Sequence, residues 1–329
     1  MSVSRAAPTV SLVLGSGGAR GYAHIGAIEE LRAQGFDIRS IAGCSMGALI
    51  GGIYAAGKLD DYRDWSRTLQ RLDVLRLLDW TFSGGGFIKG DRIIEQIKTL
   101  IGDIRIEELP ISYTAVAVDL YAQREVWFSR GPLFDAIRAS ISIPTVFRPH
   151  HYEGRTLVDG GLLNPVPITP TLRDLTDCTI AIDVNGPDDS DGGASPAGDS
   201  TFGDMRDDAP AADGHGSIQP VAAGEAEHAQ AAPRRKIASF IDGLLEKRER
   251  KHAEVAADPG VLELFGRTLD VVQQTVTRYK LAAQPPDLII SVPRDVCAFY
   301  EFHRAAEVIE LGREQARKAL LDWQVPLRR

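Results

Sequence analysis

The sequence predicts an α/β fold in which a central, mainly parallel sheet is flanked by helices. Three observations favour this class. Short aliphatic and β-branched runs alternate with amphipathic helical segments, glycine-rich turns separate them, and 44% of the 329 residues are hydrophobic against 25% charged. A chain of this length and composition can bury a full core. We therefore expect a single domain over residues 8–325.

The first elements predict a parallel pair of strands. Residues 9–14 form a buried aliphatic run, a glycine-rich turn follows, and a helical pattern then continues to about Gln34. A second strand is expected over residues 38–42. A strand-helix-strand unit this short implies a right-handed crossover, which places the turns after both strands on one rim of the sheet.

The glycine-rich turn, residues 15–21, allows three interpretations. It is similar to a dinucleotide-binding turn, but Arg20 occupies the third glycine position of the G-x-G-x-x-G pattern. It can instead form an oxyanion hole, in which the amides of Gly17 and Gly18 donate hydrogen bonds to a substrate oxygen. The third interpretation is a tight turn without a chemical role.

A G-x-S-x-G motif follows the second predicted strand and precedes a helix. This context predicts a nucleophile elbow, in which Ser45 projects from a strained strand-to-helix turn. Gly43 and Gly47 would leave room where the two backbones crowd together. The amide of Met46, at the start of the helix, is a further candidate donor to negative charge beside the serine oxygen.

The middle and end of the chain predict scaffold elements. Helices are expected over residues 60–78, 92–101 with Asp91 as N-cap, 133–140, 261–280 and 302–323, and strands over residues 113–118, 125–128, 180–184 and 288–292. The apolar segment 141–147 has two open interpretations, an acyl-chain channel and a buried loop.

Asp159 is the candidate acid. It ends a short apolar run and is followed by Gly160 and Gly161 and by a proline-bearing loop. A carboxylate held in this way suits a positioned general base. A turn cap, which is the commoner role of an Asp-Gly pair, is the alternative.

Four motifs occur together in a fixed order. They are the glycine-rich segment 15–26, Gly43-Cys44-Ser45-Met46-Gly47, the run 138–144 and Asp159-Gly160-Gly161. With them the chain resembles the patatin-like phospholipase family, particularly its bacterial members, over residues 10–184 and weakly again from residue 261. Arg20 matches the family's basic residue in the glycine-rich loop, whereas Ser16 stands where many members carry glycine.

The resemblance implies a three-layer patatin-like fold and a serine lipid acyl hydrolase of phospholipase A, lysophospholipase or carboxylesterase type. It also implies a dyad in which Ser45 is the nucleophile and Asp159 the base, with an oxyanion hole formed by Gly17 and Gly18. No cofactor is expected. Two alternatives stay open: an acyltransferase that uses the same serine, and a regulatory interaction protein with vestigial activity.

A conventional hydrolase triad would need a histidine base. Of the seven histidines, His150, His151 and His303 lie in segments that could reach the rim of the sheet. A metal site formed by His150, His151 and Glu153 is disfavoured, because adjacent side chains rarely converge on one ion. We therefore expect no metal.

Charge and cysteine usage restrict the partners. A formal net charge of -8 argues against nucleic acid, and the three cysteines form no C-x-x-C pair, so neither a disulfide framework nor a zinc site is predicted. The apolar run 10–14 is too short for a signal-peptide core, and the glycines within the uncharged stretch 41–57 argue against a membrane span. We expect a cytoplasmic protein, with peripheral contact to the inner face of the membrane.

Composition changes abruptly after the strand over residues 180–184. Residues 185–232 are rich in Gly, Ala, Asp, Pro and Ser and poor in large apolar side chains, which predicts a disordered acidic insertion within the domain. Residues 233–257 are expected to form an amphipathic helix with basic ends. Membrane docking and packing against the domain both remain open for this helix.

Overall fold

The computed structural model describes residues 7–77, 91–144, 146–187, 261–321 and 323–325. The predicted helix over residues 233–257, and the predicted insertion from residue 188 onwards, lie outside these ranges. Asn185 and Gly186 were expected to begin the insertion, but they belong to a strand that runs from Cys178 to Gly186. This strand is longer than predicted because its ladder with the last strand continues as far as Gly186.

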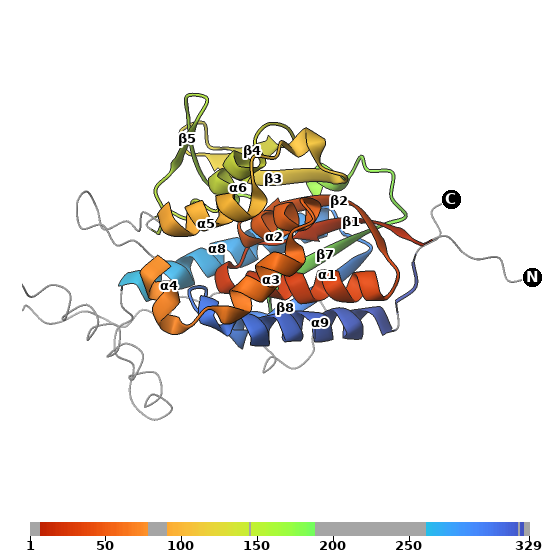
Figure 1. Cartoon of the computed structure of the whole chain (residues 1–329). Helices are drawn as coiled ribbons and strands as arrows, with labels where there is room; N and C mark the ends of the chain where they lie inside the picture. The colour runs from red at the N-terminus through yellow and green to blue at the C-terminus, as the bar shows by residue number, and fades with distance from the viewer. Residues whose placement is uncertain (1–6, 78–90, 145, 188–260, 322, 326–329) are drawn as a thin grey trace, which may run out of the picture. The chain divides into compact units, whose positions relative to one another are not determined.

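Eight strands of the described chain form one sheet, with the order β5-β6-β3-β2-β1-β7-β8 and with β4 paired to β3 (Figure 1). Their bounds are β1 Thr9–Leu14, β2 Asp37–Cys44, β3 Ser112–Asp119, β4 Arg124–Phe128, β5 His150–Tyr152, β6 Arg155–Asp159, β7 Cys178–Gly186 and β8 Leu288–Pro293. The ladders that join β3, β2, β1, β7 and β8 are parallel, and those of β4, β5 and β6 are antiparallel. The predicted mainly parallel sheet is confirmed.

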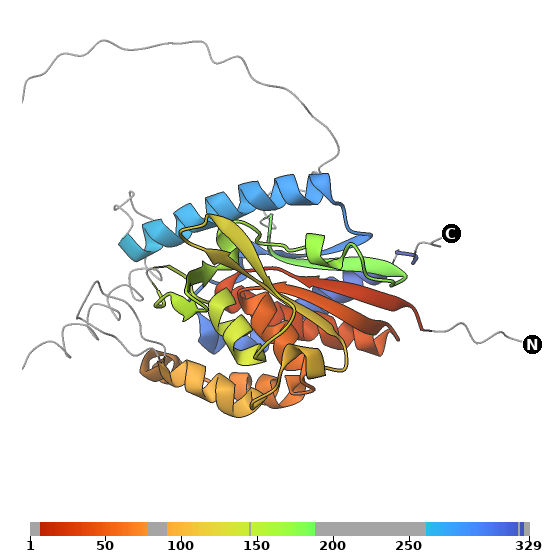
Figure 2. The ribbon, with the colours of Figure 1, turned by 90° about the horizontal axis from the view of Figure 1, so that it is seen from above.

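The helices cover both faces of the sheet, as Figure 2 shows. They are α1 Ala23–Ala33, α2 Met46–Ala55, α3 Leu59–Thr68, α4 Arg71–Leu77, α5 Asp91–Ile101, α6 Leu133–Ser140, α8 Val261–Ala283 and α9 Ala305–Leu321. On one face, the side chains of Leu12 and Leu14 join the large core formed with α1, α2, α6 and α9. On the other face, Val13 belongs to a small cluster that Leu281 of α8 covers. This arrangement gives the three layers that the family resemblance implied.

Two elements differ from the sequence prediction. The single helix expected over residues 60–78 is two helices, because the backbone of Leu69, whose side chain is buried, is extended (ψ 116°). Strand β5 was not predicted. It forms a hairpin with β6 across Glu153 and Gly154, whose φ values of 47° and 73° suit a two-residue turn with a left-handed backbone.

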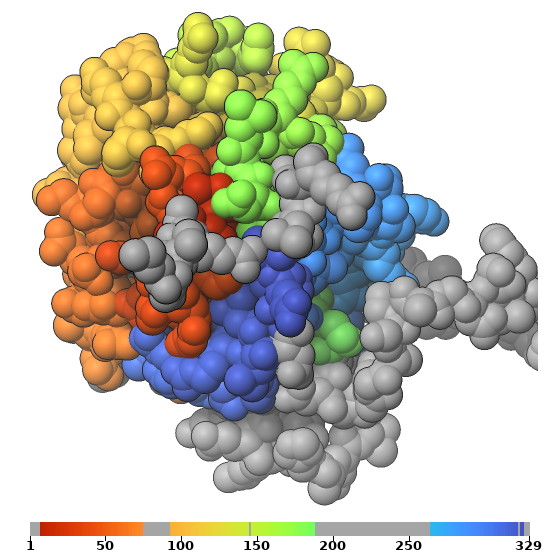
Figure 3. Space-filling view, turned by 90° about the vertical axis from the view of Figure 1, so that its right-hand side faces the viewer, coloured from red at the N-terminus to blue at the C-terminus, as the bar shows by residue number. Residues whose placement is uncertain are grey.

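The last helix packs closely against the first. A Cβ atom at Gly26 of α1 would lie 1.8 Å from the carbonyl oxygen of Ile309, and one at Gly312 of α9 would lie 2.1 Å from that of Ala23. The two backbones therefore approach as only glycine permits. On the face seen in Figure 3, the first part of the chain (red and orange), the middle part (yellow and green) and the last part (blue) adjoin one another.

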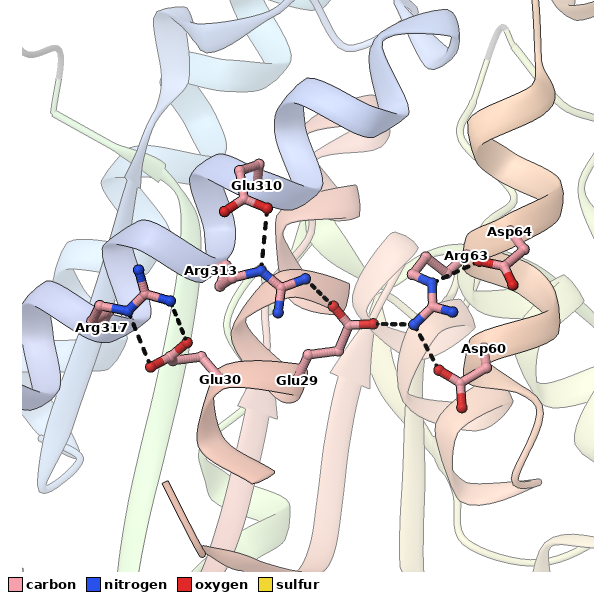
Figure 4. A network of polar contacts seen from close by, with 8 residues as sticks. All are labelled: Glu29, Glu30, Asp60, Arg63, Asp64, Glu310, Arg313 and Arg317. Carbon is pink, nitrogen blue, oxygen red and sulfur yellow. Dashed lines mark hydrogen bonds and ion pairs between the residues drawn. The ribbon is translucent and has the colours of Figure 1, made fainter. Parts of the chain in front are cut away.

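Ion pairs border this helix contact (Figure 4). Glu29 of α1 accepts hydrogen bonds from Arg313 of α9 and from Arg63 of α3, and its side chain is only 11% exposed. Glu30 accepts a hydrogen bond from Arg317 at 3.0 Å. Together these pairs tie α1 to two helices that are distant in sequence.

Candidate active site

Ser45 is the single residue between β2 and α2. Its φ of 54° and ψ of −121° lie in a region that costs a non-glycine residue on the order of 1–3 kcal/mol. A Cβ atom at Gly43 would lie 2.5 Å from the carbonyl oxygen of Gly47, and one at Gly47 would lie 2.1 Å from that of Leu14. Both positions therefore admit only glycine, and the turn holds Ser45 outside both elements.

The hydroxyl of Ser45 lies against the carboxylate at the end of β6. Ser45 Oγ donates a hydrogen bond to Asp159 Oδ2 at 2.5 Å, across 114 residues of sequence. The amide of Gly161 donates to Asp159 Oδ1 at 2.7 Å, so both carboxylate oxygens have donors. Ser45 and Asp159 are 3% and 4% exposed. The structure thus brings the predicted nucleophile and base together in a buried site.

Burial determines the protonation of Asp159. It raises the pKa of this carboxyl to about 6, and hydrogen bonds from Ser45, the Gly161 amide and the Cys44 thiol oppose the rise. The carboxylate is thus mostly ionised at neutral pH and is a stronger base than an exposed aspartate. Such a pKa suits a group that accepts and returns a proton near neutral pH.

The glycine-rich turn lies beside this pair because β1 and β2 are parallel neighbours, with Leu14 opposite Gly43. Gly18 has a φ of 56°, and a Cβ atom there would lie 2.4 Å from the carbonyl oxygen of Phe299. A Cβ atom at Gly17 would lie 2.4 Å from the side chain of Val184. The turn is therefore packed on two sides by later parts of the chain.

Backbone amides of the turn divide into two groups. Those of Ser16 and Ala19 donate to carbonyl oxygens of the protein at 2.8 and 2.9 Å. Those of Gly17 and Gly18 have no acceptor among the residues that the structure describes. The amide of Met46, at the first position of α2, has no intrahelical acceptor either. Three amides near Ser45 thus have no acceptor among the described residues.

Arg20 is not a surface residue. It is 4% exposed and donates to the carbonyl oxygens of Gly17 and Arg294 at 3.3 Å and to Asp270 Oδ1 at 2.8 Å. The guanidinium therefore joins the glycine-rich turn to α8. Its role in the described structure is to hold the turn.

Ser16, where many family members carry glycine, is also tied to neighbouring elements. Its carbonyl oxygen accepts from the Asn185 side chain at 2.7 Å, and its hydroxyl donates to Gln273 Oε1 of α8 at 3.1 Å. The hydroxyl therefore adds a contact between the turn and α8 that a glycine could not make.

A cavity of about 30 Å³ lies at this rim. It is lined by Ser16, Gly17, Gly18, Arg20, Ser45, Ile143, Asp159, Phe265, Gly266, Leu269, Asp270, Gln273 and Phe299. Since one water needs about 10–15 Å³ of such space, the cavity has room for about two waters. Side chains of α8 line one side of the cavity. Ile143 also lines it, and this residue belongs to the segment for which an acyl channel or a buried loop was expected.

No described histidine is hydrogen-bonded to Ser45 or Asp159. His24 is buried, its Nε2 lies 2.8 Å from the carbonyl oxygen of Gly15, and burial lowers its pKa to about 4. His150 lies 3.2 Å from Asp135, and His151 is hydrogen-bonded to Thr156. Neither these residues nor His303 lines the cavity. The remaining histidines, at positions 215, 228 and 252, lie outside the described ranges.

In the described part of the chain, no cluster of three or more His, Cys, Asp or Glu side chains is arranged to hold a metal ion. Among the helices of these same ranges, none combines the length and apolar character needed to cross a bilayer.

Several residues of the site carried no predicted role. Ser140 lies in the 138–144 motif, and its hydroxyl bonds the amide of Ser45 at 2.9 Å. Asp270 and Gln273 approach the site from α8. In the sequence they are two polar residues beside the apolar inner positions of an amphipathic helix. That pattern does not reveal which part of the molecule the helix covers.

Comparison with known proteins places the chain in a family. A family model described as patatin-like phospholipase matches residues 12–172. The chain is 42% identical over 345 residues to an NTE family protein of Mycobacterium tuberculosis, covering 97% of this chain and 93% of that protein. It is 32% identical over 190 residues to the neuropathy target esterase of Drosophila melanogaster, covering 56% of this chain and 13% of that protein.

Among solved structures, the crystal structure of VipD from Legionella pneumophila is similar, with a TM-score of 0.43 and 12% identity over 96% of this chain and 67% of that chain. The relationship in sequence is much stronger, since the mycobacterial protein matches along nearly its whole length. On this evidence the chain belongs to the patatin-like phospholipase family, with NTE family proteins among its relatives.

Proposed function

We propose that the protein is a serine lipid acyl hydrolase, of phospholipase A, lysophospholipase or carboxylesterase type, in which Ser45 is the nucleophile and Asp159 the base. Membership of the patatin-like phospholipase family supports a lipid substrate. The observation that carries the proposal is the 2.5 Å hydrogen bond from Ser45 Oγ to Asp159 Oδ2 at a strained strand-to-helix turn. It has the geometry of a nucleophile and its base.

The first half-reaction forms an acyl-enzyme. Asp159 accepts the proton of Ser45 as Oγ attacks the ester carbonyl carbon, and the tetrahedral oxyanion accepts hydrogen bonds from the amides of Gly17, Gly18 and Met46. The C–O bond to the alcohol then breaks, and the leaving oxygen takes the proton from Asp159.

The second half-reaction returns the enzyme to its starting state. Asp159 accepts a proton from water, whose oxygen attacks the acyl carbon, and the same amides bind the second oxyanion. When the bond to Ser45 breaks, Oγ recovers the proton and the carboxylic acid leaves. Apart from the substrate and this water, these steps use only groups of the chain, so the proposal includes no cofactor or metal.

The test is Ser45→Ala in the full-length protein. Loss of the nucleophile is expected to reduce both ester hydrolysis and covalent labelling by a fluorophosphonate probe to background, since triad serines account for roughly a millionfold in turnover. Ser66→Ala is a matched control, because Ser66 is buried in α3 and its hydroxyl donates to the carbonyl oxygen of Arg63, away from the cavity. Hydrolysis retained by Ser45→Ala would contradict the proposal.

The substrate is identified by a panel run beside the same variant. It contains phospholipids, lysophospholipids, acylglycerols and short p-nitrophenyl esters. Adding alcohol or thiol acceptors separates hydrolysis from acyl transfer, because a transferase would pass the acyl group from Ser45 to the acceptor instead of to water.

A further inference from the structure

The amide of Ser45 is bound by a side chain. It donates a hydrogen bond to Ser140 Oγ at 2.9 Å, and Ser140 Oγ in turn donates to the carbonyl oxygen of Val116 at 2.6 Å. Ser140 is the last residue of α6 and has no exposed surface. Both partners of this hydroxyl are therefore main-chain groups of the protein.

The two main-chain groups that this hydroxyl bonds lie where the β2–β3 ladder ends. Cys44 and Val116 are the last paired residues of the β2–β3 ladder, and the chain turns away at Ser45. Beyond this point the Ser45 N–H and the Val116 carbonyl group no longer pair directly, and Ser140 Oγ bonds both of them. Without it, a buried N–H would lack an acceptor, which costs about 1–3 kcal/mol.

The same end of α6 also holds the acid. The amide of Asp159 donates to the carbonyl oxygen of Ser142 at 2.9 Å. Gly160 packs on Val116, since a Cβ atom there would lie 2.2 Å from the Val116 carbonyl oxygen. Residues 140–142 are thus bonded to the backbone of both members of the dyad.

We propose that Ser140 is a positioning residue, which holds the strained backbone of Ser45 and thereby directs its Oγ toward Asp159. The inference rests on the proposed function. A residue with a φ of 54° keeps that conformation only where its surroundings enforce it. Loss of the acceptor lets the peptide group before Ser45 rotate, and a displacement of about 1 Å at a nucleophile can cost about a hundredfold in rate.

Ser140→Ala tests the proposal, with a short p-nitrophenyl ester and a fluorophosphonate as probes. We expect kcat and the labelling rate constant to fall about 10- to 100-fold. The KM should stay unchanged, because Ser140 does not line the cavity. Ser140→Thr keeps the hydroxyl and should restore most of both rates. Ser66→Ala, again as the buried-serine control, should lose stability without losing rate.

Each outcome decides the question. Labelling of Ser140→Ala at the wild-type rate overturns the inference, and so does a loss confined to KM. If Ser140→Ala does not fold, the Ser140→Thr variant decides: rates within about tenfold of wild type support the inference, and background rates contradict it. Ser45→Ala is labelled in parallel. If it reacts, the proposed function fails; if it stays unlabelled, only the role of Ser140 is in question.

Discussion

At the scale of single residues, Asp159 lies in surroundings that oppose the ionised form its proposed role requires. Burial raises its pKa from the usual 3.8 to about 6, despite donors on both oxygens. Holding the carboxylate charged at neutral pH therefore costs folding free energy, on the order of 3 kcal/mol for a shift of this size. Stability and the proposed chemistry conflict at this position.

Asp159→Asn should relieve that cost. Because the folded-state pKa lies above the unfolded one, the wild-type protein loses stability as the pH rises from about 4 to 6, and the full loss persists at higher pH. We expect the variant to unfold with a free energy about 1–3 kcal/mol higher than wild type at pH 8, and with a difference about a third as large at pH 4.5. Urea denaturation at both pH values measures this. A variant less stable than wild type at pH 8 would show that the donors outweigh the burial.

The sequence predicted some residues of the site and not others, for a physical reason. Ser45 and Asp159 could be proposed from their motifs, because a strained serine turn and an acid held by glycines have local signatures. Their 2.5 Å contact depends on how β2 and β6 pair with β3, and the bond of Ser140 to Ser45 depends on how α6 packs on the sheet. No local pattern reports what a buried hydroxyl such as that of Ser140 will bond.

Among the elements, those with clear periodicity and clear stops matched the sequence prediction best. Strand β1 and helix α6 begin and end where expected. Gly15 follows the last residue of β1, and Pro132 precedes the first residue of α6. The prediction of one long helix over residues 60–78 was wrong at Leu69, where the backbone is extended and the apolar side chain is buried. The function of α8 could not be predicted, since its inner face looks like any core-packing stripe.

Helix α8 gives the prediction at this scale. The side chain of Leu269 lines the cavity beside Ser45, which has room for about two waters. Shortening this side chain is therefore expected to make more room for an acyl group. Leu269→Ala should raise kcat/KM for a short p-nitrophenyl ester several-fold while lowering stability. Val272→Ala is the control on the same helix, because Val272 is 43% exposed and does not line the cavity. Equal rates for the two variants would count against this steric limit.

In the whole molecule, the site depends on segments far apart in the chain. The family model covers residues 12–172, which contain Ser45, Asp159 and the glycine-rich turn. Asp270, Gln273 and Phe299, which also line the cavity, come from beyond that region. The contact of α9 with α1 brings this last part of the chain against the first, and the ion pairs of Glu29 and Glu30 border it.

The close contact of α1 and α9 can be tested with one methyl group. A Cβ atom at Gly312 would lie 2.1 Å from the Ala23 carbonyl oxygen, and this neighbour is backbone, so the helices must separate. Gly312→Ala should therefore destabilise the protein by about 1–3 kcal/mol, even though alanine favours helix. Glu314→Ala is the control, because it introduces the same residue at a position of α9 whose side chain is 54% exposed. It should change stability by less than about 0.5 kcal/mol. Thermal unfolding of both variants measures the difference. A Gly312→Ala variant as stable as Glu314→Ala would mean that the two helices can separate without loss, and that the fold does not depend on their contact.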